Sequence, residues 1–336
     1  MTKNTKTAIN TILFLGIGAF LFYWAIGKED TSQLFSEMRK ANMWWIALSM
    51  LCGVLSHFAR GLRWNLLLTP MGYKAGVWSS FHAVILGYLV NMALPRVGEI
   101  TRPAVLSKVE NIPFNKLVGT VVIERVVDML ITILIAVSIF FIQFDTIADY
   151  LTGLFGSLSS NAVLLYAGIS VVALIGVFLA YKYRNFFYNL PIIEKFKGFI
   201  EGVFDGIKAI FNLDQKGLFI FYSLFIWVMY FCMPFFVLYA LPGTAHLGVS
   251  AGLTVLLFGT AAMIVPVPGG VGTFEVMVPA ALALYAIDSL LANSYTLITH
   301  AIQFIVVLGV GVFSVLYFVV KTQKIKKNEL ARSTEG

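Results

Sequence analysis

Residues 92–107 read MALPRVGEITRPAVLS, and residues 263–282 read MIVPVPGGVGTFEVMVPAAL. Each stretch interrupts a long apolar run with proline and glycine, and each places a glutamate shortly after the interruption. Proline ends a helix because it lacks the amide N–H, and glycine permits a reversal of the backbone. The two stretches therefore predict two broken helices inside a largely apolar chain.

The composition indicates an integral membrane protein. Of 336 residues, 59% are hydrophobic and only 12% are charged, a balance that no water-soluble domain of this size shows. Apolar runs of about 20 residues, the length that crosses a bilayer as a helix, recur along nearly the whole chain and leave no room for a soluble domain. We expect a single all-α polytopic membrane domain over residues 1–336.

The basic residues do not indicate a nucleic-acid partner. The net charge of +7 arises from Lys and Arg in short segments beside the apolar runs, as the positive-inside rule predicts for cytoplasmic loops. The basic start MTKNTK precedes a long run without a cleavage site before Lys28, which favours a retained first span over a signal peptide. Cys52 and Cys232 each lie inside an apolar run and predict neither a disulfide nor a metal site.

We expect about six full spans plus two re-entrant helical hairpins. The hairpins are expected near residues 77–107 and 249–287. An amphipathic segment near 192–211 is expected either to lie on the membrane surface or to pack against the protein. The expected spans lie near residues 8–27, 43–67, 117–143, 160–181, 217–241 and 294–320.

The distribution of Lys and Arg indicates how the broken runs insert. Residues 182–216 contain six of these side chains, whereas 144–159 and 242–248 contain none. If each broken run enters and leaves by one face, both termini and the 182–216 segment become cytoplasmic. The hairpins then enter from opposite faces, as in inverted-repeat transporters, whose substrate sites form at broken helices. The residues expected at the turns are Pro95, Gly98, Pro266, Pro268, Gly269, Gly270 and Gly272.

Three charged residues fall inside the expected span 117–143. Glu124, Arg125 and Asp128 lie within about one helical turn, and a spacing of three brings Arg125 against Asp128. Such charges are unfavourable in hydrocarbon unless they are paired or hydrated, which favours a position facing the bundle interior. The alternative is a position near the cytoplasmic end of the span, where side chains reach the headgroups.

The two breaks carry further candidate charges. Arg96, Glu99 and Arg102 follow one another at intervals of three, and two arginines offer planar donors suited to phosphate or carboxylate. The alternative is a solvated loop with an internal ion pair. Glu275 is expected either to cap the helix after the second break or to pair with an arginine of the other hairpin.

Other polar groups are expected to have structural roles, as interface anchors and as an interhelical hydrogen bond. For the interface anchors, a role in binding substrate is the alternative. The anchors are His57, Arg60, Arg63 and Trp64, and the hydrogen-bonding groups of the last span are His300 and Gln303. The sequence contains no P-loop, HExxH, GxSxG or paired-cysteine motif. We therefore expect no catalytic residue, metal or cofactor.

Three motifs in order, LPRVGEITRP, ERVVDML and PVPGGVGTFE, resemble the flippase-like family typified by the membrane portion of lysylphosphatidylglycerol synthases. The resemblance covers roughly residues 9–320 and implies a protein that moves a lipid between leaflets. Those synthases continue into a soluble catalytic domain, whereas this chain ends at Gly336, so lipid synthesis is not implied. The matching positions are Arg96, Gly98, Glu99, Arg102, Glu124, Arg125, Asp128, Pro268, Gly269, Gly270, Gly272 and Glu275.

The expected function is lipid translocation in the cell (inner) membrane, with Arg96 and Arg102 on a phosphate headgroup and the acids balancing their charge. The expected partners are membrane lipids, with a second copy of the chain or a lipid-modifying enzyme as further possibilities. The rival functions are an embedded enzyme on lipid-linked substrates, with Glu99 or Asp128 as base or metal ligand, and a scaffold for lipid-modifying enzymes.

Overall fold

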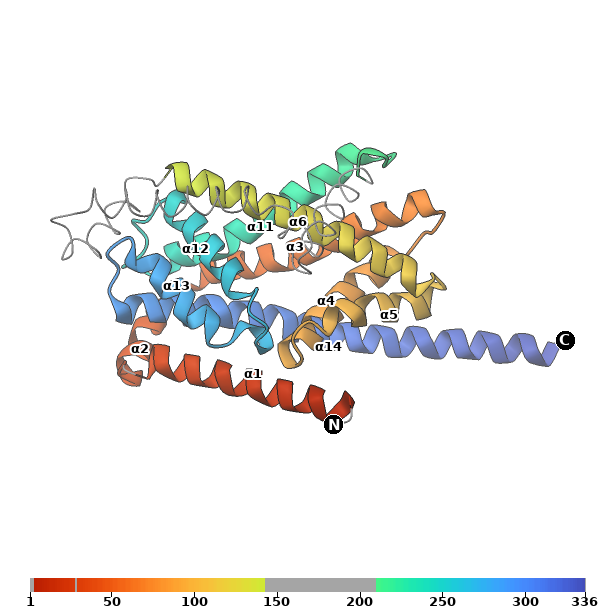
Figure 1. The fold of residues 1–336 in the computed structure, drawn as a ribbon, viewed down its shortest axis with the longest axis horizontal. Coiled ribbons are helices and arrows are strands. Elements are labelled where there is room, and N and C mark those ends of the chain that lie inside the picture. Colours follow the sequence, from red (N-terminus) through yellow and green to blue (C-terminus); the bar gives the residue numbers. More distant parts are fainter. Residues whose placement is uncertain (1–2, 28, 143–209, 336) are drawn as a thin grey trace, which may run out of the picture.

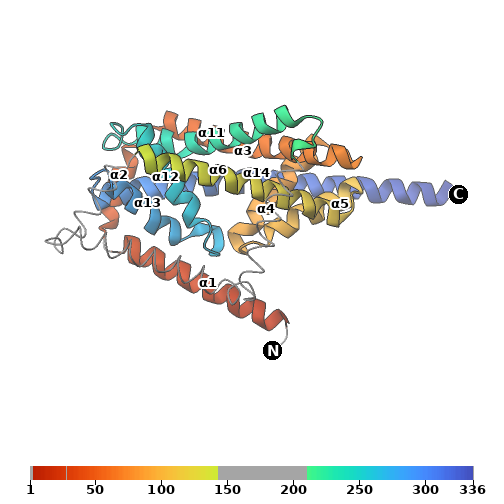
Figure 2. The same ribbon diagram turned by 45° about the horizontal axis from the view of Figure 1, so that its top comes forward.

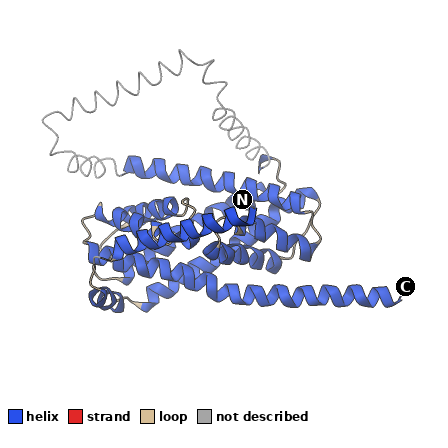
Figure 3. Cartoon of the chain, turned by 60° about the horizontal axis from the view of Figure 1, so that its bottom comes forward, coloured by secondary structure: helices blue, strands red, loops and turns tan. Residues whose placement is uncertain are grey.

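The computed structural model describes residues 3–27, 29–142 and 210–335, and these residues form helices and turns without a strand (Figure 3). The expected all-α class is therefore confirmed for the described part of the chain. The expected span 160–181 lies outside the described residues, as does all but the end of the expected surface helix 192–211.

The helices follow one another with short connections. In chain order they are α1 (Lys3–Ile26), α2 (Thr31–Arg39), α3 (Met43–Leu68), η1 (Thr69–Met71), α4 (Val77–Ala93), α5 (Gly98–Glu110), α6 (Phe114–Ile142), α11 (Lys216–Ala240), α12 (Val249–Ala262), η3 (Pro268–Gly270), α13 (Thr273–Ala283) and α14 (Ser289–Glu335).

Four of these helices are long and apolar enough to cross a membrane. They cover Met43–Met71, Phe114–Ile142, Lys216–Ala240 and Ser289–Asn328, and shorter apolar helices include α4 and α12. Large apolar side chains on the outside of the bundle, such as Phe20, Phe141 and Phe313, are more than half exposed. Lipid tails can cover such a surface, whereas water cannot do so favourably.

The long helix α14 runs along the length of the molecule and joins two apolar cores (Figure 1). One core lies among α11, α12, α13 and α14, and the second lies among α3, α4, α5, α6 and α14. Each core therefore encloses one of the two broken helix pairs, α12/α13 and α4/α5.

The first break follows from Pro95. The residue before a proline is driven from the helical region by the ring, and Leu94 is extended, with φ −129° and ψ 103°. Arg96 then takes the left-handed conformation with φ 66°, which is unfavourable for a side chain other than glycine. Gly98, expected at the turn, is instead the first residue of α5.

Gly98 is required by a close approach of two helix backbones. A Cβ atom at Gly98 would overlap the carbonyl group of Gly87 in α4. The amide of Gly98 donates to Asn91 Oδ1 at 2.7 Å. These contacts fix the position of α5 against α4.

The second break uses three left-handed glycines in place of one arginine. Gly269, Gly270 and Gly272 have φ angles of 60°, 77° and 86°, a region that glycine enters without steric cost. Pro268 and Gly270 are buried. The break therefore carries irregular backbone into the protein interior, as its proline and glycine content predicts.

The turns of the two broken pairs meet near the middle of the molecule (Figures 1 and 2). The pair α4/α5 lies toward one end of the long axis and α12/α13 toward the other. Arg96 Nη2 of the first break donates to the carbonyl oxygen of Ile264 in the second, at 3.3 Å. The breaks are thus in direct contact.

A pH-dependent contact at Glu110 ties α5 to α14. Lys321 Nζ lies 2.7 Å from Glu110 Oε1, and the amide of Gly76 donates to the same oxygen at 3.3 Å. Burial raises the pKa of Glu110, but hydrogen bonds from Lys321 and Ser79 and the lysine charge outweigh it and lower the pKa overall. A lowered folded-state pKa stabilises the protein above the ordinary glutamate range, and this stability is lost as pH falls through the lowered value.

We therefore expect Glu110→Gln to lower the melting temperature in detergent most strongly at neutral pH. The difference from the parent should shrink on acidification, because the parent loses the same contact. A difference that stays constant across the titration would contradict this assignment.

Candidate functional site

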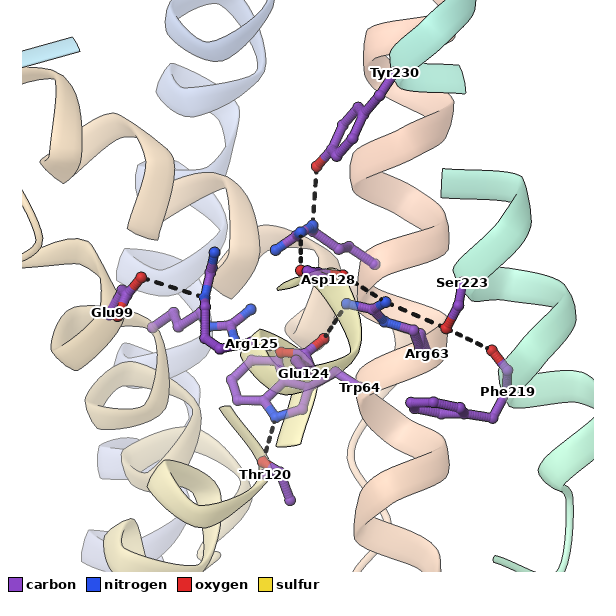
Figure 4. Close-up of polar contacts among 12 residues, drawn as sticks. Arg63, Trp64, Glu99, Thr120, Glu124, Arg125, Asp128, Phe219, Ser223 and Tyr230 are labelled. Carbon is purple, nitrogen blue, oxygen red and sulfur yellow. Dashed lines mark hydrogen bonds and ion pairs between the residues drawn. The ribbon is translucent and has the colours of Figure 1, made fainter. Parts of the chain in front are cut away.

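Five charged side chains meet in the interior of the membrane bundle and form what we call the arginine cluster. Arg60 and Arg63 lie one turn apart on α3, Arg102 lies on α5, and Glu124 and Asp128 lie one turn apart on α6. All five residues are buried. Spacings of three and four place each helix's charged side chains on one face, where they meet the other helix (Figure 4).

Asp128 holds the two arginines of α3 together. Its Oδ2 accepts from Arg60 Nη2 at 2.6 Å, and its Oδ1 accepts from Arg63 Nη1 at 2.9 Å. Charge-assisted hydrogen bonds of this kind are among the strongest in proteins. One carboxylate thus orients both guanidinium groups.

Glu124 connects the same arrangement to α5. Arg102 Nη2 donates to Glu124 Oε2, and Arg63 Nη2 lies 3.5 Å from Glu124 Oε1. The side chains of Glu124 and Arg63 are both 0% exposed. The site is therefore occluded in this conformation.

Aromatic and hydroxyl groups surround the cluster. The guanidinium carbon of Arg102 lies 4.8 Å from the ring centre of Trp64, a cation–π contact. Trp64 Nε1 donates to Thr120 Oγ1 at 2.7 Å, and Arg60 Nε donates to the Tyr230 hydroxyl at 3.0 Å (Figure 4). These contacts fix the arginine side chains from several helices.

The cluster has more positive than negative charge and more donors than acceptors. Three arginines face two carboxylates, which leaves one net positive charge. Within the described part of the chain, Arg60 Nη1, Arg63 Nε and Arg102 Nε are buried and have no hydrogen-bond partner. Buried donors without acceptors are unfavourable, and an anion placed beside them would supply both the missing charge and the missing acceptors.

Glu99 and Arg125 form a second ion pair beside the cluster. Arg125 Nε lies 3.3 Å from Glu99 Oε1, and the two side chains are 44% and 43% exposed. The expected contact between Arg125 and Asp128 is therefore wrong, because Arg125 turns to α5 while Asp128 faces α3. The pair lies at the edge of the same interface between α5 and α6.

The other two sequence-predicted charges lie outside the cluster. Arg96 is exposed and contacts the backbone of the second break. Glu275 Oε2 accepts from the amide of Gly272 at 2.7 Å, the capping role expected for a carboxylate at a helix start. Its other oxygen contacts His300, so the expected alternative of an arginine partner across the breaks is wrong.

Sequence reasoning assigned Arg60 and Arg63 to the membrane interface, and the structure corrects this. Their side chains are 3% and 0% exposed and lie against the acids of α6. Trp64 and His57 are buried as well. Two features of the sequence pointed to this arrangement. The acids Glu124 and Asp128 need more buried positive charge than Arg102 alone supplies, and residues 57, 60 and 64 share one face of a helix.

The structure also contains a groove on the outside of the bundle, with a volume of about 620 Å³. None of the five cluster residues lines it. Among the described residues, no group of three or more His, Cys, Asp or Glu side chains is arranged to hold a metal ion. The groove residues are His82, Phe313, Leu316, Tyr317, Val320, Lys321 and Lys324.

The sequence over residues 11–311 matches the model of a protein family, the lysylphosphatidylglycerol synthase TM region. The chain belongs to this family. Membership of this family, together with four helices long enough to cross a membrane, identifies the chain as a multi-pass membrane protein. The resemblance drawn from the three motifs is confirmed.

The chain is similar to two UPF0104 membrane proteins and to one glycosyltransferase, each at about a quarter identity. The UPF0104 membrane protein MJ1595 of Methanocaldococcus jannaschii is 25% identical over 97% of this chain and 98% of that protein. The UPF0104 membrane protein PH1989 of Pyrococcus horikoshii is 24% identical over 89% and 93%. Glycosyltransferase AglD of Haloferax volcanii is 27% identical over 85% of this chain but only 51% of its own length. The search of solved structures finds no match.

Proposed function

We propose that this chain translocates a lipid with an anionic headgroup between the leaflets of the cell (inner) membrane, with both termini in the cytoplasm. The observation that carries the proposal is the arginine cluster, which has a net positive charge and three buried donor nitrogens without partners among the described residues. A phosphate group supplies the missing charge and several acceptor oxygens. Membership of a lipid-related family supports the same class of ligand.

The burial of the arginine cluster fits an occluded intermediate of a transport cycle, in which neither leaflet has access to the site. A headgroup cannot reach Arg63 or Glu124 while both are 0% exposed, so binding requires α5 or α6 to move relative to α3. The acyl chains remain in the bilayer during transfer, and only the headgroup needs a polar path. A small number of buried charges is then sufficient to bind the headgroup.

The two broken pairs supply the moving parts in this proposal. We assign α4/α5 and α12/α13 to re-entrant hairpins inserted from opposite faces, which form an inverted repeat about the contact between Arg96 and Ile264. Rocking of one pair against the other would then expose the cluster to each leaflet in turn. Single cysteines at positions 107 and 289 check this topology, since a membrane-impermeant reagent should label Ser107→Cys and Ser289→Cys from opposite sides.

Reconstitution into liposomes with tagged lipids tests translocation. Protein-dependent leaflet exchange is expected for lipids with a phosphate headgroup and not for a phosphate-free glycolipid. Arg60→Gln removes a buried charge together with the unpartnered donor Arg60 Nη1. We expect exchange to fall by about 10-fold or more, the value of one charge-assisted hydrogen bond.

The matched control is Arg125→Gln, which removes the same charge from a half-exposed position beside the cluster. This variant should retain most of the exchange. Equal exchange in empty and protein-containing vesicles, across a panel of phosphate headgroups, would refute the proposed function.

A second candidate is a membrane module that serves a lipid-modifying enzyme, either as a partner or as part of a longer chain. It is favoured by the relation to glycosyltransferase AglD, of which this chain spans about half. Formation of a covalently modified lipid by the purified protein alone would favour an embedded enzyme. Co-purification with a lipid-modifying enzyme, without leaflet exchange, would favour the module.

A further inference from the structure

A second buried polar site lies at the second break, where α13 meets α14. His300 Nδ1 of α14 lies 2.5 Å from Glu275 Oε1 of α13, and His300 Nε2 lies 2.9 Å from the carbonyl oxygen of Gly269. The side chains of His300 and Glu275 are only 6% and 2% exposed. One imidazole therefore joins α14 both to the start of α13 and to the left-handed turn.

The two contacts of His300 require a specific number of protons. A carbonyl oxygen can only accept, so Nε2 must carry hydrogen to bond Gly269. The contact with Glu275 then needs another proton, either on Nδ1 facing a carboxylate or on Glu275 facing a bare Nδ1. Both forms of the pair have zero net charge.

Loss of that second proton breaks one of the two contacts. A neutral imidazole beside an ionised Glu275 has one N–H for two acceptors. If hydrogen stays on Nε2, lone pairs of Nδ1 and Oε1 face each other, and if it moves to Nδ1, the bond to Gly269 is lost. The released proton passes to water, and the charge of the pair changes from zero to minus one.

Among the described residues, no other charged side chain forms an ion pair with His300 or Glu275. The rings of Phe274 and Phe304 pack on His300, with ring centres 4.6 and 4.9 Å from the imidazole. The helix α12 and the turn η3 contain no ionisable residue, and α13 contains only Glu275. Ionisable groups on the other elements around α13, η3 and α14 include Tyr23 of α1, His57 of α3, His82 and Tyr88 of α4, Arg96 of the first break, Tyr230 and Cys232 of α11, and Tyr295 of α14.

Three of these neighbouring groups have contacts of their own. Arg96 donates to Ile264, His82 Nδ1 contacts Ser314 Oγ at 2.9 Å, and the Tyr295 hydroxyl donates to the carbonyl oxygen of Pro234 at 2.7 Å. Buried Glu and His side chains inside membrane proteins commonly belong to the proton relays of pumps and transporters.

We propose that Glu275 and His300 form a proton-binding site whose occupancy holds the second break closed. Resting on the translocation function proposed above, this site couples proton movement to leaflet exchange. When the site holds its proton, His300 of α14 bonds both Gly269 of the turn and Glu275 at the start of α13. When the proton leaves, one of these two hydrogen bonds is lost. The break that contacts Arg96 then becomes free to move.

Glu275→Gln mimics the form of the site in which Glu275 carries the proton, because the amide cannot release one. The glutamine amide oxygen can accept from the backbone N–H of Gly272, and its amide nitrogen can donate to His300 Nδ1. His300 Nε2–H can still donate to the carbonyl oxygen of Gly269. The variant is therefore expected to fold and to hold the break closed as pH rises. His82→Gln is the matched control, because His82 also joins α4 to α14 but contacts a hydroxyl that both donates and accepts.

The first measurement is cysteine labelling at the break. Both natural cysteines are first replaced, by Cys52→Ala and Cys232→Ala, and Val265→Cys then introduces a single thiol at a position that is 41% exposed. The rate of labelling by a hydrophilic thiol reagent is followed from mildly acidic to mildly alkaline pH. The ratio of parent to Glu275→Gln rates, which cancels the reagent's own pH dependence, should rise several-fold with pH. The His82→Gln variant should show the same rise as the parent.

The second measurement is leaflet exchange in proteoliposomes with and without an imposed pH gradient. Exchange by the parent should change several-fold with the gradient, and exchange by Glu275→Gln should not respond. A flat labelling ratio would overturn the proton site even if exchange is present. A rising ratio without exchange by any variant would support the proton site and overturn the translocation function.

Discussion

Asp128→Asn is expected to destabilise the protein by about 3–5 kcal/mol, the usual effect of removing one partner from a buried ion pair. Asp128 accepts from Arg60 and Arg63 at 2.6 and 2.9 Å. Asparagine keeps one acceptor oxygen but turns an amide N–H₂ toward a guanidinium donor. The cluster would then hold two net positive charges in the bundle interior.

Thermal unfolding in detergent, followed by retention of monodisperse protein after heating, measures this effect. Glu99→Gln is the matched control, since it breaks the half-exposed pair with Arg125 and should change stability by about 1 kcal/mol or less. Adding Arg60→Gln to Asp128→Asn restores the original net charge and should recover part of the loss. Equal melting temperatures for Asp128→Asn and Glu99→Gln would show that Asp128 does not hold the cluster together.

Gly98→Ala is expected to have a comparably large effect through backbone packing. The added methyl group would overlap the carbonyl of Gly87 and lie 2.7 Å from Asn91 Oδ1. Overpacking of a flexible side chain costs about 1–3 kcal/mol, and here the obstacle is a helix backbone that cannot rotate away. We expect a loss of about 3 kcal/mol or more.

The displacement should also reach the cluster. The helix α5 begins at Gly98 and carries Arg102, so a shift of α5 moves the guanidinium away from Glu124. Leaflet exchange should fall together with stability. Gly119→Ala is the control, because a Cβ at this position meets nothing within 4 Å and alanine favours the helix by about 1 kcal/mol. Normal stability of Gly98→Ala would contradict the close packing of α4 and α5.

The class of the fold and the position of both breaks could be predicted from the sequence because they depend on local chemistry. Pro95 and the segment PVPGG end helices wherever they occur, and long apolar runs require a membrane. The exact conformation of the first turn could not be predicted. The left-handed residue is Arg96 and not Gly98, because Gly98 is needed at the contact with α4.

The candidate site was only partly predictable. The acids Glu124 and Asp128 were expected inside the bundle, since short carboxylates cannot reach the headgroups. Their partners could not be read from spacing within one helix, because Arg60 and Arg63 precede them by 61 to 68 residues and lie on another helix. Such tertiary contacts outweigh a local pair worth a few tenths of a kcal/mol. The same reasoning explains why Arg125 faces Glu99.

The left-handed backbone at Arg96 affects how strongly the two breaks are held together. This conformation costs a side chain other than glycine about 1–2 kcal/mol, and it is kept while Arg96 reaches the Ile264 carbonyl. A hydrogen bond from a charged donor is worth about 1.5–3 kcal/mol net, so the strain offsets a large part of what this bond contributes. The polar contact between the two turns therefore adds little to the free energy that holds them together.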